Sequence, residues 1–178
     1  MSQEKLDQLL DRTAALHEAV YAHRATLQPY PGNRFTVAFQ SCLLSMEHAT
    51  SILLLINAEL YPSAYTLTRP QFESLVRGIW LMYAASDNWV EKLGEPLTLE
   101  SARRANEGPM PADMLKELDK APNAPAPIVA QLKEYKEVTW KAMNSYAHGG
   151  LHRLSRALTG YSKNYFIGSN PARVNFLG

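Results

Sequence analysis

Apolar residues recur at three- and four-residue spacing along almost the whole chain, and this pattern limits the fold more than any other feature. The pattern is the one an amphipathic helix requires, and no segment alternates apolar and polar residues for long, as a half-buried strand would. The segment 3–28 shows it clearly and ends at Pro29-Tyr30-Pro31-Gly32, a strong helix stop. We therefore expect an all-α fold, an up-and-down bundle of four long helices.

The other three long helices are expected over residues 34–60, 63–86 and 125–148. Asn33 is a suitable N-cap for the first of them. Its apolar residues point to most sides of the helix, which predicts a central helix covered by its neighbours. They are Leu43, Leu44, Met46, Ile52, Leu53, Leu54, Leu55 and Ile56. In the segment 63–86, Pro70 removes one backbone hydrogen bond and should bend the helix.

Prolines gather in one stretch, because six of the eleven lie between Pro96 and Pro127. The region 94–127 is therefore expected to leave the bundle as short helices, about 98–106 and 111–120, joined by turns. After Gly149-Gly150 a short helix is expected at 151–159, and Asn170-Pro171 has the form of a further helix start. The whole chain, 1–178, is expected to be one domain.

Composition narrows the class of protein. A chain of 178 residues, 46% of them hydrophobic, is long enough for one domain with a real core. With 18 Lys and Arg against 17 Asp and Glu, the net charge of +1 argues against a broadly basic nucleic-acid binder. Residues 133–178 alone carry seven basic and two acidic residues, which suits either a phosphate-bearing or acidic partner or a solvated face.

Compartment and cofactor predictions follow from what the sequence lacks. A single Cys42 excludes an internal disulfide framework and a Cys-rich metal site. The longest apolar run, 52–56, is far shorter than the roughly 20 residues of a membrane span, and residues 1–25 lack the apolar core of a signal peptide. We expect a cytoplasmic protein with no membrane partner and no cofactor.

Arg69, Glu73 and Arg77 lie four residues apart, on one stripe of the expected helix 63–86. At about 100° per residue, Arg69 and Glu73 fall within the apolar arc that Val76 and Trp80 also occupy. A charged pair in that position must be mutually satisfied. The pair is expected either to fix the packing of this helix or to orient a catalytic or binding group from another helix.

The segment Asn144-Ser-Tyr-Ala-His148-Gly-Gly150 ends the last long helix. On a helical wheel Asn144 and His148 lie opposite the apolar stripe that includes Met143 and Tyr146. His148 is therefore expected to face water, another helix or a second subunit. The alternative is an ordinary helix end, in which a C-terminal His is favoured by the helix dipole and a Gly caps the helix.

A metal site is a weaker alternative. His148 and His152 are four residues apart, which is metal-ligand spacing on a continuous helix, but Gly149-Gly150 stands between them. Glu47, His48 and His17 are third ligands by residue type only. No phosphate-binding loop, nucleophile elbow or HExxH motif is present, and Cys42 is expected to be a small core residue.

Two short motifs carry a family resemblance. Asn144-Ser-Tyr-Ala-His148 is similar to the second part of the RNxxxH signature of HEPN-domain proteins. The pattern Arg69-Pro-Gln-Phe-Glu73-Ser-Leu-Val-Arg77-Gly-Ile-Trp80, with the later Tyr146-Ala-His148-Gly-Gly150, resembles a group of bacterial helical proteins with an R-x-x-x-E helix and a late H-G motif. The resemblance covers roughly 35–160.

The resemblance implies an all-α, often dimeric protein of a defence or toxin–antitoxin type, which binds RNA or nucleotides or cleaves RNA without a metal. It implies His148 as general acid/base or phosphate ligand, Asn144 as a positioning residue, Arg69 on phosphate charge and Glu73 orienting Arg69 or His148. The further substrate-binding residues are Arg77, Tyr146, His152 and Arg153.

One departure leaves the question of catalysis open, because Met143 stands where the signature has its Arg. Arg69, Arg77 and Arg153 are the possible replacements. The alternative function is a non-catalytic module that dimerises or binds a partner protein and contains a buried Arg–Glu–His network.

Overall fold

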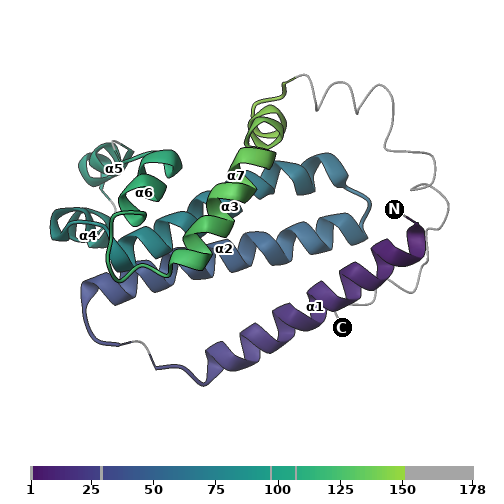
Figure 1. Ribbon diagram of the computed structural model, residues 1–178, viewed down its shortest axis with the longest axis horizontal. Coiled ribbons are helices and arrows are strands. Elements are labelled where there is room, and N and C mark those ends of the chain that lie inside the picture. Colours follow the sequence, from purple (N-terminus) through teal and green to yellow (C-terminus); the bar gives the residue numbers. More distant parts are fainter. Residues whose placement is uncertain (1, 29, 97, 107, 151–178) are drawn as a thin grey trace. The chain divides into compact units, whose positions relative to one another are not determined.

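The computed structural model describes residues 2–150, apart from residues 29, 97 and 107, and its regular structure in this part is helical throughout. The four long helices are α1 (Gln3–Ala25), α2 (Asn33–Asn57), α3 (Tyr61–Tyr83) and α7 (Ala126–Ala147) (Figure 1). The all-α prediction is confirmed. The helices expected at 151–159 and after residue 170 lie outside the described residues.

Three short helices connect α3 to α7. They are α4 (Asp87–Gly94), α5 (Leu99–Asn106) and α6 (Pro111–Leu118). The short helices expected in the proline-rich region correspond to α5 and α6, whereas α4 was not predicted. Only three residues separate α4 from α3, and none of them is a proline or glycine that would mark the start of a new helix.

The chain forms two compact units, which are described separately. The first unit comprises residues 1–27, 49–68 and 141–178, and the second comprises residues 28–48 and 69–140. By these boundaries α1 belongs wholly to the first unit and the short helices belong to the second. Three long helices, α2, α3 and α7, contribute residues to both units.

The core of the second unit is built on α3. Trp80 is 1% exposed, and its indole Nε1 donates a hydrogen bond to Glu117 Oε2 of α6 at 2.6 Å. The apolar side chains buried with it come from α3, α4, α6 and α7: Phe72, Val76, Leu81, Val90, Met114, Leu115, Leu118, Val129 and Leu132. This arrangement corrects the prediction that the apolar helix 34–60 is the central, covered one.

Among the described residues of α2, only Ala38 and Ser45 are fully buried. The apolar side chains of α2 are spread around the helix, so no single stripe of them faces the core. By length and composition α2 is long and apolar enough to cross a membrane, as the core helices of soluble proteins also are.

Arg34 of α2 holds the end of α3. Its guanidinium donates hydrogen bonds to the backbone oxygens of Leu81, at 2.5 Å, and Ala85, at 2.9 Å. The same group forms an ion pair with Asp87 Oδ1 at 2.7 Å. The last carbonyls of a helix lack partners within the helix, so Arg34 both satisfies them and fixes the start of α4.

Candidate functional site

The residues predicted to form a site are distributed over both units. Arg69, Glu73 and Arg77 belong to the second unit, and Asn144, Tyr146 and His148 belong to the first. His152 and Arg153 lie outside the described residues.

Arg69 and Glu73 form the predicted ion pair, with Arg69 Nε 2.8 Å from Glu73 Oε1. The two side chains are 18% and 26% exposed, so the pair is largely shielded from water. The four-residue spacing on α3 brings the groups together, as the helical wheel predicted. Arg77, one turn further along, is exposed.

Trp140 of α7 is a second contact of Arg69. The guanidinium carbon lies 5.3 Å from the centroid of the indole ring, and Lys136 Nζ lies 5.5 Å from the same ring. Phe72 of α3 meets Trp140 edge-on, with centroids 6.4 Å apart. These contacts join α3 to α7, so the Arg69–Glu73 pair takes part in helix packing. Trp140 and Lys136 were not predicted as site residues, because the contact of Trp140 with Arg69 joins two helices distant in sequence.

The end of α7 has the geometry of a Schellman cap. Gly149 has φ 68°, in the left-handed region. The Gly150 N–H donates a hydrogen bond to the backbone oxygen of Ser145 at 2.7 Å. A Cβ at Gly150 would lie 2.8 Å from Ser145 Oγ. The expected Gly cap at this helix end is therefore present, and the double glycine serves to stop α7.

His148 and Asn144 differ in their surroundings. His148 is exposed, as expected for a residue opposite the apolar stripe, whereas Met143 is 3% exposed and belongs to the interior. The Oδ1 atom of Asn144 is buried and has no hydrogen-bond partner in the described structure. A buried acceptor without a donor destabilises its surroundings by about 1–3 kcal/mol.

Tyr146 is an interior residue. It is 9% exposed, and its ring stacks on that of Tyr65 of α3 with centroids 4.8 Å apart. The backbone oxygen of Tyr146 also accepts a hydrogen bond from Thr66 Oγ1 at 3.5 Å. Tyr146 therefore holds the end of α7 on α3 within the first unit, a position from which it can orient the segment Asn144–His148.

The described residues bring together no metal-ligand cluster. Within the part of the chain that the structure describes, no three His, Cys, Asp or Glu side chains lie close enough together to hold a metal ion. Burial raises the pKa of the Cys42 thiol, which keeps it protonated at neutral pH. Cys42 was expected to be a core residue, and in the structure it is half-buried.

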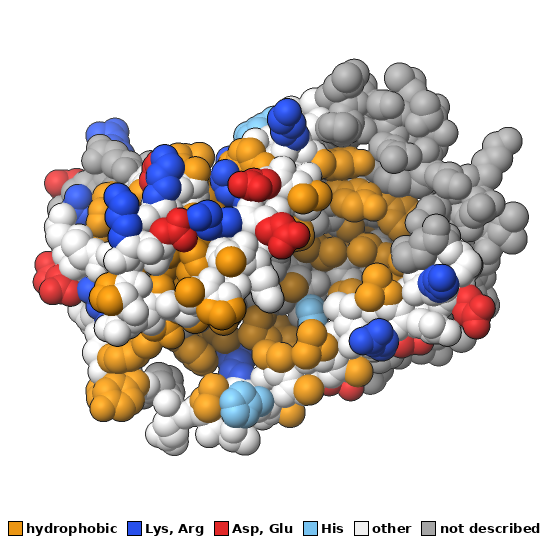
Figure 2. Space-filling model, viewed as in Figure 1, with side chains coloured by type: hydrophobic (Ala, Val, Ile, Leu, Met, Phe, Trp, Pro, Cys, Tyr) orange, Lys and Arg blue, Asp and Glu red, His pale blue; other side chains and the backbone are white. Residues whose placement is uncertain are grey.

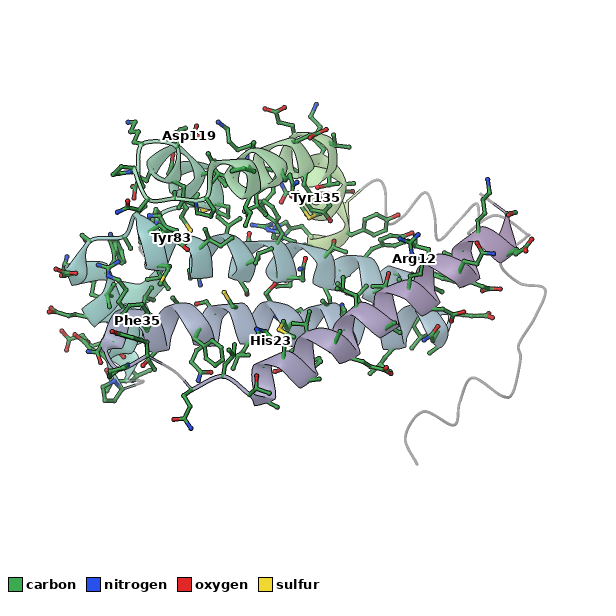
Figure 3. The ribbon with its side chains drawn as sticks, turned by 60° about the horizontal axis from the view of Figure 1, so that its bottom comes forward. Arg12, His23, Phe35, Tyr83, Asp119 and Tyr135 are labelled. Atoms are coloured by element: carbon green, nitrogen blue, oxygen red, sulfur yellow. The ribbon has the colours of Figure 1, made fainter. Side chains whose placement is uncertain are left out.

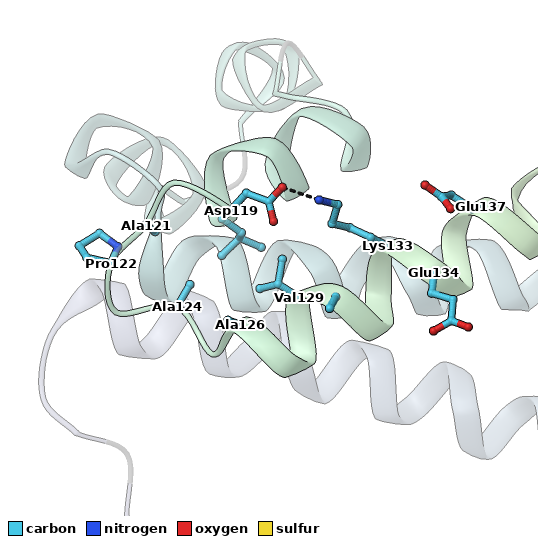
Figure 4. Close-up of a pocket in the computed structure, with 11 residues that line it drawn as sticks. Asp119, Ala121, Pro122, Ala124, Ala126, Val129, Lys133, Glu134 and Glu137 are labelled. Atoms are coloured by element: carbon cyan, nitrogen blue, oxygen red, sulfur yellow. Dashed lines mark hydrogen bonds and ion pairs between the residues drawn. The ribbon is translucent and has the colours of Figure 1, made fainter.

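A cavity of about 400 Å³ lies in the second unit, where the loop after α6 meets the start of α7 (Figure 4). Its apolar lining includes Leu118 and Val129. Lys133 forms an ion pair with Asp119 at its edge, and Glu134 also lines it. This cavity could not be predicted from residue spacing, because its two sides come from different elements.

The comparisons with known proteins bear on the family alone. Neither the curated proteins nor the solved structures that were compared include a match to this chain. A family model, described as a family of unknown function (DUF6988), matches residues 42–169, from the first half of α2 to beyond α7. This match spans well over half of the sequence, and the chain therefore belongs to the DUF6988 family.

Proposed function

We propose that the protein is a HEPN-like, cytoplasmic RNA-binding protein of a bacterial defence or toxin–antitoxin-like system, and that its RNA site lies at the end of α7. One observation carries the proposal. An exposed His148 stands one helical turn after Asn144, whose buried side-chain oxygen has no partner. An exposed histidine side chain and an unsatisfied acceptor are thus one turn apart in sequence.

The chemistry of these two groups suits single-stranded RNA. The His148 ring has N–H donors for a phosphate oxygen, and when protonated it adds a positive charge. The Asn144 oxygen is buried in the unbound protein, so its side chain must turn outward to accept a hydrogen bond from a 2′-hydroxyl or a base N–H, groups that unpaired RNA presents. A donor from the ligand would relieve the unsatisfied acceptor, so binding would be stabilised at this position.

Binding is a better proposal than cleavage. The signature Arg is replaced by Met143, whose side chain is buried, so this position provides no cation for a scissile phosphate. Arg69 is held by Glu73 at 2.8 Å, which engages its charge within the second unit. Figure 2 shows Lys and Arg side chains interleaved with Asp and Glu on the visible face, which favours a local RNA contact over a broad basic surface.

The test is fluorescence anisotropy of a labelled single-stranded RNA with wild-type protein, His148→Ala and His23→Ala. His23 is an exposed histidine on α1 and serves as the matched control. We expect His148→Ala to weaken binding about tenfold, as for loss of a charge-assisted hydrogen bond. His23→Ala should bind as wild type does.

The RNA recovered from the same samples, kept in EDTA, should be intact. Equal affinity for wild type and His148→Ala would contradict the proposed site. Cleavage of the RNA by wild type but not by His148→Ala would instead show a HEPN-like ribonuclease, with the missing Arg replaced from elsewhere.

A second function, a non-catalytic module that dimerises or binds a partner protein, is favoured by the packing of Arg69. Its ion pair with Glu73 and its contact with Trp140 form the kind of polar cluster that locks helices together. On this proposal Glu73→Ala lowers the melting temperature, and His148→Ala leaves RNA affinity unchanged. The exposure of His148 counts against its place in a sealed network.

A further inference from the structure

An open groove of about 710 Å³ lies between α1 and the part of α2 that belongs to the first unit. Its lining is largely apolar and includes Leu10, Ala14, Leu53 and Leu54. Leu54 remains 47% exposed, so the groove leaves apolar surface in contact with water. Contiguous exposed apolar surface of this kind marks a site of association.

Polar contacts fix the two helices on either side of the groove. The hydroxyl of Thr50 on α2 lies 3.3 Å from His17 Nδ1 and 3.2 Å from the Tyr21 hydroxyl, both on α1. All three residues line the groove. The two walls of the groove are therefore joined to each other by side-chain hydrogen bonds.

One rim of the groove is acidic. Asp11 and Glu18 line it, both are exposed, and they lie seven residues apart on α1. Seven residues are about two helical turns, or roughly 10 Å along the axis. Glu4, a further seven residues back and also exposed, continues this acidic row along the same face.

The opposite face of α1 carries an exposed apolar row. Leu9, Leu16 and Val20 are 51%, 61% and 39% exposed. Their spacing of seven and four residues places them within about 40° on the helix, a narrow stripe of the kind that packs against another helix. Nothing in the described residues covers this stripe.

Basic residues flank the exposed row. Lys5 and Arg12 lie along one edge, seven residues apart, and Arg24 lies on the other edge. All three side chains are exposed, as is His23 beside the row; Arg12 and His23 are labelled in Figure 3. One helix thus bears an apolar row with a basic edge on one face and an apolar groove with an acidic rim on the other.

We propose that the exposed row of α1 in one copy of the chain docks in the α1–α2 groove of a second copy. Lys5 and Arg12 of the first copy would face Asp11 and Glu18 of the second. The two charged rows have opposite signs and the same seven-residue spacing. The opposite charges therefore pair whether the two α1 helices pack parallel or antiparallel.

The other occupants fit less well. If two α1 helices packed through their exposed rows, basic edges would meet basic edges, which is unfavourable. An anionic membrane surface does not suit the groove, because the acidic rim would repel it. The contact uses two different faces of one helix, so it is a head-to-tail contact. An assembly built from it has an unoccupied groove at one end and an unoccupied exposed row at the other, where further copies can add.

Charge exchange tests this contact on the full chain. The first variant, Lys5→Glu with Arg12→Glu, reverses the basic edge, and the second, Asp11→Lys with Glu18→Lys, reverses the acidic rim. At low salt, light scattering should give wild type a mass above that of the monomer, rising over about a hundredfold range of concentration. Each double variant alone should remain monomeric.

An equimolar mixture of the two variants restores opposite charges at both contacts and should assemble again, as should the chain with all four substitutions. The exchange Asp113→Lys with Lys116→Glu, at an exposed ion pair on α6, is the control and should assemble as wild type does. Circular dichroism establishes that each variant is folded.

Several results would overturn the proposal. Wild type could remain monomeric at every concentration, or both double variants could still assemble. The mixture could fail to assemble although both variants are folded. Wild type could also form a closed dimer that does not grow with concentration. RNA binding at His148 is a separate observation, so either proposal can fail without the other.

Discussion

At Gly78 the α2 and α3 backbones approach so closely that a side chain would not fit. An added Cβ would lie 2.6 Å from Cys42 Sγ. It would also lie 3.1 Å from the backbone oxygen of Ala38 and 3.2 Å from the backbone nitrogen of Cys42. Glycine inside a helix is otherwise less stable than alanine by about 1 kcal/mol. The close approach of the two helices explains why glycine stands here.

We therefore expect Gly78→Ala to lower the free energy of unfolding by about 1–3 kcal/mol, because overpacking outweighs the gain in helix propensity. Gly94→Ala is the control, since its Cβ would meet Val37 Cγ1 at an ordinary 3.5 Å. Urea denaturation measures both. A Gly78→Ala protein as stable as the control, or more stable than wild type, would contradict the close packing.

Cys42 gives a second prediction at the scale of single residues. Burial raises the pKa of its thiol in the folded chain. Above the ordinary thiol pKa of about 8.5, the unfolded chain loses a proton that the folded chain keeps, so unfolding becomes more favourable. The contribution of Cys42 to stability is complete below that pH and is lost as pH rises through the folded pKa.

Compared with Cys42→Ala, wild type should therefore lose more stability between neutral pH and about pH 10. Urea titrations at the two pH values measure the difference. The folded thiol should also react with a disulfide reagent much more slowly than the thiol in urea. Rapid reaction of the folded protein would show an accessible Cys42.

Among the helices, the bond between Trp80 and Glu117 joins α3 to α6. The indole of Trp80 is 1% exposed, so its N–H has little access to water if Glu117 is removed. We expect Glu117→Leu to lower the free energy of unfolding by about 1–3 kcal/mol. Glu117→Gln, which retains an acceptor, should lower it by less. Thermal unfolding compares them, and equal losses would mean that the hydrogen bond contributes nothing.

The predictability of the helices from sequence depended on their length and on the turn residues that bound them. Apolar residues at helical spacing over 22 to 25 residues identified all four long helices, and prolines marked off α5 and α6. No proline or glycine separates α4 from α3, so α4 was missed. The apolar character of α2 led to the wrong prediction of a central helix. Apolar residues all around a helix identify surface to be covered, but they do not say which neighbour covers it.

The candidate site was predictable in part for the same reason. Within one helix, angular position follows from residue number, so the Arg69–Glu73 pair and the outward position of His148 could be predicted. Contacts between helices depend on packing that spacing does not encode. For this reason the contact of Arg69 with Trp140 and the groove between α1 and α2 emerged only from the structure.

For the molecule as a whole, both proposals concern the first unit. The exposed His148 at the end of α7 and the groove along α1 belong to that unit, whereas the large buried core of α3, α6 and α7 belongs to the second. On this account the second unit supplies much of the stability, and substitutions such as Gly78→Ala change folding without altering RNA contacts. RNA affinity should change with substitutions of His148 and should stay the same in Gly78→Ala.

The most direct test of the RNA site is a nuclear magnetic resonance titration of ¹⁵N-histidine-labelled protein with a short single-stranded RNA. The chain has five histidines, so each ring can be assigned by substitution. The account predicts that the His148 ring signals shift as RNA is added, while those of His23, on α1, stay in place. RNA that binds and leaves the His148 signals unchanged would contradict it.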